Sequence, residues 1–397
     1  MTSLGTRPPP VPTLPGLEPL PPSDAELGAA VALANLPRLT PARLRRLIVR
    51  HGPLPAFDLV ASGAVLSDPW FERSFGRRAD ERRDLSTRWS RALKAIDPQT
   101  ALRACSHAGI DVHVLGRPGY PELLADDTDP PAVLFTRGSL GALTGRRAAI
   151  VGTRNATAAG RSTATELGRA LAEAGVRVVS GLARGIDGAA HRGALSAHAA
   201  PPVGIVGSGL DVVYPPEHAD LWSSVAQRGL LASESPPGAA PEGWRFPLRN
   251  RILAALSEVV VVVESRETGG SLVTADAAAA RGVPVMAVPG SVRCRSSAGV
   301  NQLLADGCAP VRDALDILVA LGLTSAGRPA RRRREAEPDD PTDAAVLLHF
   351  GSEPLTLDEL VQASARPLAE VALAIGRLEQ AGFIDRTGGW FERAARR

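Results

Sequence analysis

The stretch SGLARGIDGAAH, residues 180–191, decides the fold class of this chain. A short β-branched run, VRVVSG, leads into it at residues 176–181, and an alanine-rich segment of helical character follows it. The order strand, glycine turn, helix is typical of an α/β sheet. The first amides of such a helix are unpaired and its dipole adds partial positive charge, so the turn could hold phosphate or another anion. A tight turn without a ligand is the alternative interpretation.

The region around this stretch, from about residue 146 to 320, alternates apolar runs with helical segments. Several runs are apolar on both faces, as buried parallel strands require, and the helices between them predict right-handed crossovers. We expect strands at residues 148–152, 176–180, 203–207, 258–264 and 283–289. The prediction is an extended Rossmann-like, doubly wound α/β domain with a mainly parallel sheet, whose ligand lies at the carboxyl ends of the strands.

The length and composition of the chain predict a soluble protein of two or three domains. It has 397 residues, and no apolar run among its 44% hydrophobic residues reaches the length of a membrane span. Prolines stand where a signal peptide would need an apolar core, so we expect a cytoplasmic location and no membrane partner. Cys105, Cys294 and Cys308 lie far apart without a CxxC spacing, so we expect no disulfide, no metal and no cofactor.

The pattern along the chain divides it into five parts. Residues 1–22 are proline-rich and are expected to be disordered. Residues 23–110 predict a small helical domain, SAM-like or helix-hairpin-helix-like, with Thr40 as a helix cap and Pro41 at the first helical position. The hairpin glycines of a helix-hairpin-helix unit are missing, so we favour a packing or docking role for this domain. Residues 111–323 form the predicted Rossmann-like domain.

The remaining two parts are a linker and a small terminal domain. Residues 324–341 are a charged linker with four consecutive arginines, a run that is usually solvated. Residues 342–397 follow the order helix, helix, helix, hairpin of a winged helix. The third helix is expected to begin at Pro367, and Arg377 is its only cation. That helix is a poor reader of DNA, so protein contact or weak DNA contact is the expectation.

Two loops at predicted strand ends carry arginine. In VGTRNATAAG, residues 151–160, Arg154 follows the strand and Thr157 can cap the next helix. The loop is not GxGxxG, so a dinucleotide is not expected. In the opening stretch, Asp187 and His191 are four residues apart on one helix face. They could form an acid/base pair, but no nucleophile is supplied and a structural hydrogen bond is the preferred interpretation.

Two further loops complete the set. Residues 204–221 contain glycines that do not run into a helix, so we expect a solvent-facing loop in which Tyr214 can stack on a base. In FPLRNRILAALS, residues 246–257, two arginines lie near a helix N-terminus, where positive charge is disfavoured by about 0.3 to 1 kcal/mol each. An anionic guest would offset this, and pairing with Glu234 or Glu264 is the alternative. The turn at Gly269 is another candidate anion nest.

Cations spread over separate loops along one sheet edge favour a polymer over a mononucleotide. They suit successive phosphates of a single strand, with Phe246 or Tyr214 available for stacking. The predicted nucleic-acid site comprises Gly152, Thr153, Arg154, Ser180, Gly181, Arg184, Phe246, Arg249, Asn250, Arg251, Gly269, Gly270 and Ser271.

Taken in order, these motifs resemble the bacterial DNA-processing protein A family, DprA or Smf. The matching segments are VGTRNATAAG (151–160), SGLARGIDGAAH (180–191), GSGLDVVYP (207–215), FPLRNRI (246–252), GGSLVTA (269–275), VPG (288–290) and GVNQLLADG (299–307). The resemblance implies a homodimer that binds and protects single-stranded DNA and loads RecA recombinase onto it during natural transformation, without catalysis. It also implies that Arg154 and the Arg249, Asn250, Arg251 run contact DNA. Ala159 and His218 depart from the residues usual in the family.

A phosphoribohydrolase with a related fold is the competing enzyme class. Such enzymes follow a double glycine with glycine-threonine and a glutamate. Aligning on Gly269 and Gly270 places Leu272, Val273 and Asp276 at those positions, which weakens the enzyme hypothesis.

Overall fold

The computed structural model describes residues 20–69, 71, 79–323, 338, 340–350, 354–387 and 389–393. The chain divides into two compact units, the first ending at Thr324 and the second beginning at Ser325. Most of the expected tail (1–22) and most of the expected linker (324–341) lie outside the described residues. None of the described helices has the length and apolar character needed to span a membrane.

The first unit begins with helices only. They are α1 (Asp24–Ala34), α2 (Pro41–His51), α3 (Pro53–Ala61), the 3-10 turn η1 (Ala64–Ser67), α5 (Ala79–Ala95) and α6 (Pro98–His107). The predicted cap of α2 is confirmed, since the Thr40 hydroxyl accepts a hydrogen bond from the Arg43 amide and Pro41 opens the helix. Buried Trp89 ties α5 to the α1–α2 turn, because its indole nitrogen donates to the Pro37 carbonyl at 2.8 Å.

A nine-stranded sheet follows, in the order β1-β2-β6-β5-β4-β3-β7-β8-β9. The five expected strands are confirmed as a parallel group: β3 (Arg147–Val151), β4 (Arg177–Ser180), β5 (Val203–Ile205), β7 (Val259–Val262) and β8 (Val285–Ala287). The sequence analysis missed β1 (Asp111–Val114), β2 (Val133–Gly138), β6 (Leu230–Ser233) and β9 (Ala309–Pro310). Strand β2 pairs antiparallel with both β1 and β6.

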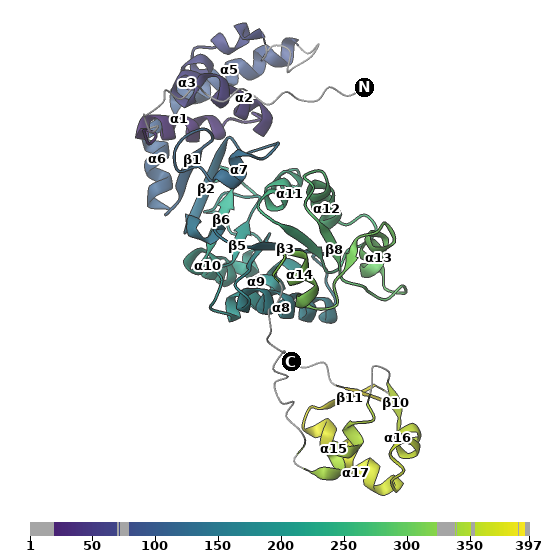
Figure 1. Cartoon of the computed structure of the whole chain (residues 1–397). Coiled ribbons are helices and arrows are strands. Elements are labelled where there is room, and N and C mark those ends of the chain that lie inside the picture. Colours follow the sequence, from purple (N-terminus) through teal and green to yellow (C-terminus); the bar gives the residue numbers. More distant parts are fainter. Residues whose placement is uncertain are drawn as a thin grey trace. The chain divides into compact units, whose positions relative to one another are not determined.

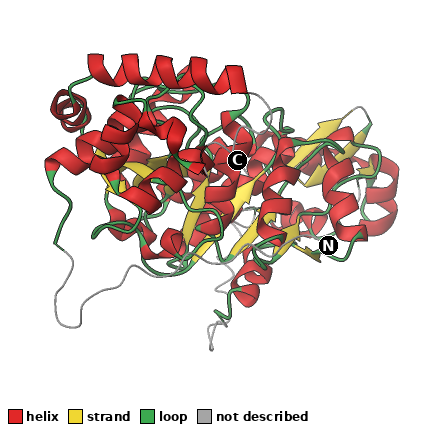
Figure 2. Cartoon of the chain, turned by 90° about the horizontal axis from the view of Figure 1, so that it is seen from above, coloured by secondary structure: helices red, strands yellow, loops and turns green. Residues whose placement is uncertain are grey.

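Helices cover both faces of this sheet (Figures 1 and 2). One face packs against α8 (Ala158–Glu173), α9 (Ile186–Ser196) and α14 (Ala314–Ala320), and the other against α11 (Arg245–Ala255), α12 (Gly270–Ala279) and α13 (Ala298–Ala305). In β3, Ile150 joins the core of the first face and Val151 that of the second, because successive side chains alternate across a strand. The predicted doubly wound fold class is confirmed.

The helical region and the sheet share one hydrophobic core. Leu33 of α1 and Trp89 of α5 belong to the same buried cluster as Val133 and Phe135 of β2. The helices α7 (Glu122–Ala125) and α10 (Ala219–Arg228), with the 3-10 turn η3 (Pro216–His218), complete this end of the sheet. Ion pairs Arg45–Asp129 and Arg117–Glu26 cross the same junction. A continuous core of this kind fixes the two regions relative to each other.

The second unit is a winged helix, as predicted. It contains α15 (Pro341–Leu347), α16 (Leu357–Ser364) and α17 (Leu368–Gln380), with a small sheet of β10 (Leu355–Thr356), β12 (Trp390–Arg393) and β11 (Ile384–Thr387). Pro367 caps α17, the predicted start of the third helix. Arg377 donates to both carboxylate oxygens of Asp343.

Candidate nucleic-acid interface

Two exposed arginines stand side by side where β3 and β4 end. Arg154 follows β3 and Arg184 follows β4, and these two strands are parallel neighbours. The loops touch, because the Ile186 amide donates to the Thr153 carbonyl at 3.3 Å. Gly185, at φ 75°, makes this approach possible, since a Cβ there would lie 2.3 Å from the Thr153 carbonyl oxygen. The sheet therefore brings two predicted phosphate contacts to one edge.

An aromatic pair lies beside Arg154. The Phe246 ring, in the first turn of α11, lies with its centroid 4.5 Å from the guanidinium carbon of Arg154. The Tyr214 ring is 5.7 Å from Phe246, centroid to centroid. Phe246 can come this close to the sheet because Gly207 has no side chain, and a Cβ there would lie 3.3 Å from the ring. A cation over an accessible ring offers both charge and a stacking surface.

Arg184 already has an ionic partner. Its guanidinium pairs with the carboxylate of Glu217, and both side chains are largely exposed. The hydrogen bond to Glu217 raises the pKa of Arg184 and lowers the pKa of Glu217. A phosphate that approached Arg184 would compete with this carboxylate. The sequence analysis missed Glu217, which lies 33 positions further along the chain with no spacing rule that links the two residues.

Arg249 lies beneath the surface, which corrects the expectation of a direct phosphate contact. Its side chain is buried, with a residue exposure of 7%, and occupies the space that Gly181 leaves without a Cβ. The guanidinium donates to the carbonyls of Gly181, at 2.8 Å, and of Ile205. Burial lowers the pKa of Arg249, and Asp187 opposes this shift. Arg249 therefore connects the ends of β4 and β5 from below.

Arg251 is buried as well. It pairs with a carboxylate, which is the alternative to a DNA contact that the sequence left open. It donates to both carboxylate oxygens of Glu234 at 2.6 Å and to the Asp129 carbonyl at 2.7 Å. The other candidate partner, Glu264, instead accepts the Thr157 hydroxyl and amide at the start of α8. Thr157 also caps α8, as predicted. Arg251 therefore forms a structural ion pair with Glu234 and does not lie on the surface that a strand of DNA could reach.

The start of α12 lies against the same helix. The Asn250 side-chain amide donates to the Gly270 carbonyl at 3.3 Å and so connects α11 to α12. Ser271 is buried, and its hydroxyl donates to the Ser265 hydroxyl at 2.8 Å. Gly269 is the N-cap residue of α12 and Gly270 is exposed. The anion nest predicted at this turn stays a prediction.

Asp187 and His191 do not form the expected hydrogen bond. The Asp187 carboxylate accepts the Gly181 amide at 3.1 Å, and burial raises its pKa to about 6 against the opposing charge of Arg249. His191 is completely buried, and neither of its ring nitrogens bonds to any described residue. Burial is the main cause that lowers its pKa to about 4, so the ring is neutral at pH 7. Neither group is open to a substrate.

The loop that begins at residue 204 differs from its prediction. We expected a solvent-facing loop, but residues 203–210 are buried, and only from Asp211 onward does the loop reach solvent. The Ser233 hydroxyl donates to the Ser208 carbonyl at 2.8 Å and holds the loop against β6. His218 is also buried, with Nδ1 2.9 Å from the Leu182 carbonyl oxygen. Tyr214 lies between these fixed points and is partly exposed.

Comparison with known proteins identifies the family. The sequence model described as "DNA recombination-mediator protein A" matches residues 111–322. The chain belongs to this family. A second model, "DprA winged helix domain", matches residues 329–389. The region of the first match holds Arg154, Arg184, Tyr214 and Phe246, so the exposed cluster lies within the part that defines the family.

The chain is similar to named relatives over most of its length. It is 36% identical over 362 residues to a protein named "Putative DNA processing protein DprA" from Mycobacterium tuberculosis, covering 88% of this chain and 90% of the relative. It is 39% identical over 221 residues to "DNA processing protein DprA" from Bacillus subtilis, covering 55% and 74%. The crystal structure of DNA processing protein A from Streptococcus pneumoniae superposes with a TM-score of 0.59 at 27% identity, covering 76% of this chain and 98% of that one.

The described residues hold no metal cluster. No group of three or more His, Cys, Asp or Glu side chains among them is arranged to bind a metal ion. Cys105 is buried, and Cys294 and Cys308 are partly buried free thiols.

Proposed function

We propose that this chain binds single-stranded DNA along the edge where β3, β4 and β5 end. The observation that carries the proposal is the contact of exposed Arg154 with the partly exposed ring of Phe246, with partly exposed Tyr214 and exposed Arg184 beside it. The two arginines would contact successive phosphates, and the aromatic rings would stack with unpaired bases. Base stacking tolerates any sequence, so this site favours single strands of mixed sequence.

Buried Arg249 and the turn at Gly181 support the surface from below in this proposal. Arg249 holds the carbonyls of two neighbouring strand ends, and a shift of either end would move Arg184 or Phe246. We therefore assign Arg249, Asn250 and Arg251 to positioning, and Gly152, Thr153, Ser180 and Gly181 to the backbone of the strand ends. Gly269, Gly270 and Ser271 remain the proposed anion-binding turn on the far side of α11.

The test is the salt dependence of oligonucleotide binding. Arg154→Ala and Arg184→Ala are each expected to weaken binding of an oligothymidylate and to reduce the slope of log affinity against log salt by about 0.7, the value for one phosphate of a single strand. Arg169→Ala is the matched control, because Arg169 is an exposed arginine of α8 in an ion pair with Glu173. Unchanged affinity and slope in both site variants would overturn the proposed surface.

We propose further that the protein is a non-enzymatic mediator that loads RecA onto incoming strands in the cytoplasm during natural transformation, and that it acts as a homodimer. Family membership supports this role, and the burial of Asp187 and His191 fits a site without catalysis. Strand exchange by RecA on DNA coated with single-strand-binding protein should be faster when the chain is present. Sedimentation should give twice the monomer mass. Release of free base from nucleoside monophosphates would contradict the non-enzymatic assignment.

A further inference from the structure

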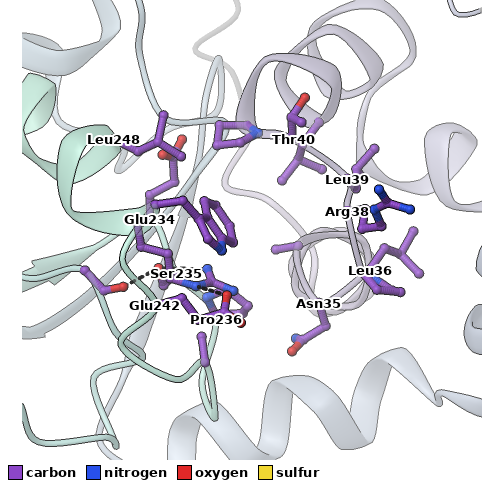
Figure 3. Close-up of a pocket in the computed structure, with 18 of the residues that line it drawn as sticks. Asn35, Leu36, Arg38, Leu39, Thr40, Glu234, Ser235, Pro236, Glu242 and Leu248 are labelled. Carbon is purple, nitrogen blue, oxygen red and sulfur yellow. Dashed lines mark hydrogen bonds and ion pairs between the residues drawn. The ribbon is translucent and has the colours of Figure 1, made fainter. Parts of the chain in front are cut away.

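A cleft separates the α1–α2 turn from the segment that leads into α11. Its volume is about 870 Å³, within the range of cavities that hold small ligands. Figure 3 shows its two walls: Leu36, Arg38, Leu39 and Thr40 on one side, and Glu234, Ser235, Glu242 and Leu248 on the other. The two walls belong to the same compact unit, whose core is continuous beneath them. The cleft is therefore a fixed part of the structure of the first unit.

Trp244 is the distinctive residue of this cleft. It is the N-cap residue of α11 and 54% of its surface is exposed, although tryptophan is normally largely buried. The guanidinium carbon of Arg245 lies 4.3 Å from the centroid of a Trp244 ring. The same pairing of arginine with an aromatic ring occurs two residues later, at Arg154 and Phe246. The start of α11 thus carries two aromatic surfaces, each with its own arginine.

The cleft adjoins the proposed DNA surface through two buried residues. Gly207, which lies under Phe246, also lines the cleft, and so does Arg249. Trp244 and Phe246 are about 200° apart around a helix. A strand that stacked one base on Phe246 would therefore cross the first turn of α11 to reach Trp244.

The opposite wall supplies a cation. Arg38 is in the left-handed backbone region at φ 61°, an uncommon conformation for a residue with a side chain. Its side chain is 67% exposed and pairs with Glu81 at 3.5 Å. This long contact at the surface contributes little to stability. Arg38 thus lines the cleft with an exposed side chain, which could exchange Glu81 for a phosphate.

We propose that this cleft binds an unstacked base of the same DNA strand, stacked on Trp244, with the flanking phosphate at Arg38 or Arg245. The inference rests on the proposed function, because it extends the strand that lies over Phe246. It gives the N-terminal helical region a direct part in DNA binding. A strand must be long enough to pass over both aromatic residues before the second subsite contributes.

The experiment compares Trp244→Ala with the wild-type chain on oligothymidylates of about 4 to about 24 nucleotides. Base stacking on an aromatic residue is worth roughly 1–3 kcal/mol, so long oligonucleotides should bind about 5- to 150-fold more weakly to the variant, whereas the shortest should bind equally well. Trp244→Phe should keep most of the affinity. Arg154→Ala should weaken binding at every length, which separates a failure of this inference from a failure of the proposed function.

Trp390→Ala is the matched control, since Trp390 in the second unit is also half-exposed, at 50%. It should leave binding unchanged at every length. Equal affinity of Trp244→Ala and wild type for the long oligonucleotides would overturn the proposal. A loss in Trp390→Ala without a loss in Trp244→Ala would overturn it as well, and would move the second subsite to the winged helix.

Discussion

Arg154 and Arg249 carry the same guanidinium group at the same sheet edge, but their surroundings give them different tasks. Arg154 is exposed above the Phe246 ring, where it can reach a phosphate. Arg249 is buried opposite Asp187 and is engaged by two carbonyls. The motif letters cannot distinguish these tasks, because they depend on how deep the start of α11 lies beneath the strand ends. Burial is therefore the property that divides the predicted site residues.

Removal of Glu217 should strengthen DNA binding. Its carboxylate competes with phosphate for Arg184, so Glu217→Gln should raise the affinity for an oligonucleotide about 2- to 5-fold at low salt, and the gain should shrink as salt screens the pair. Glu173→Gln is the control, since it removes an equivalent charge from the exposed pair with Arg169. Equal gains in the two variants would show that only the total charge matters. Fluorescence anisotropy at two salt concentrations measures the affinity of both variants for the oligonucleotide.

Arg249→Ala should act on folding. It removes the buried guanidinium that donates to the Gly181 and Ile205 carbonyls and the charge that opposes the desolvation of Asp187. Each lost hydrogen bond to a charged group costs about 1.5–3 kcal/mol of unfolding free energy. Urea unfolding should show the loss, and the double variant Asp187→Asn, Arg249→Met should recover part of it. A single variant as stable as the wild type but weaker in DNA binding would instead support a direct phosphate contact.

At the scale of elements, α8 and α9 pack closely on one face of the sheet, and α9 carries the buried His191. A neutral ring in this position is compatible with the fold. A charged ring would lose its hydration, and the interaction with the Ser180 backbone offsets only part of that loss. The stability of this layer is therefore linked to pH.

His191 should make the protein less stable in mild acid. Its pKa is about 4 when folded and about 6.5 when unfolded, so between these values the unfolded chain binds more protons and stability falls as pH falls. The loss from pH 7 to pH 5 is about 2 kcal/mol. Asp187 changes the stability in the opposite direction, because its pKa is raised in the folded state. The contribution of His191 is therefore isolated by comparing a His191 variant with the wild-type chain.

His191→Leu should therefore lose less stability than the wild type between pH 7 and pH 5, by about the same 2 kcal/mol. Urea unfolding at the two pH values measures this difference. His107→Gln, at an exposed histidine at the end of α6, should keep the wild-type dependence. A His191→Leu profile parallel to that of the wild type would refute the link.

Some of the strands and site loops could be predicted from the sequence, and others could not. Five of the seven described parallel strands were predictable, because each of the five is an apolar run between helical segments. Strands β2 and β6 were missed. Their runs, VLFTRG and LLAS, hold only three and two consecutive large apolar residues, too few to stand out as strands in the sequence. The loops of the candidate site were predicted from their glycines and arginines. The depth of Arg249, the pairing of Arg184 with Glu217 and the cleft at Trp244 depend on contacts between distant segments, which spacing does not encode.

At the scale of the whole molecule, the winged-helix segment is acidic although the chain carries a small positive charge. The chain has a formal net charge of +3, but residues 340–393 contain nine Asp or Glu residues and only four arginines. The outer surface of α17 exposes Leu368 and Leu373, and its one arginine is held by Asp343. A helix that reads DNA presents cations and polar side chains to the groove. We therefore expect the described part of the winged helix to be a poor reader of DNA.

A chain truncated after residue 324 should accordingly bind oligothymidylate within about 2-fold of the full-length affinity, because the proposed surface lies wholly in the first unit. Gel-shift titration at fixed salt measures this. A second truncation after residue 339 retains the four arginines at 331–334 and serves as the comparison. A loss of more than about 10-fold that the longer truncation restores would assign DNA binding to that basic run, and a loss shared by both would assign it to the winged helix.

The far edge of the large sheet limits how copies of this chain can assemble. Strand β9 has only two residues, and the second is Pro310, which has no amide hydrogen to donate. The opposite edge strand, β1, packs against α1 and α6. Short and proline-ended edges prevent a neighbouring chain from adding a strand. The proposed homodimer would therefore join through helices or loops, and the two sheets would stay separate.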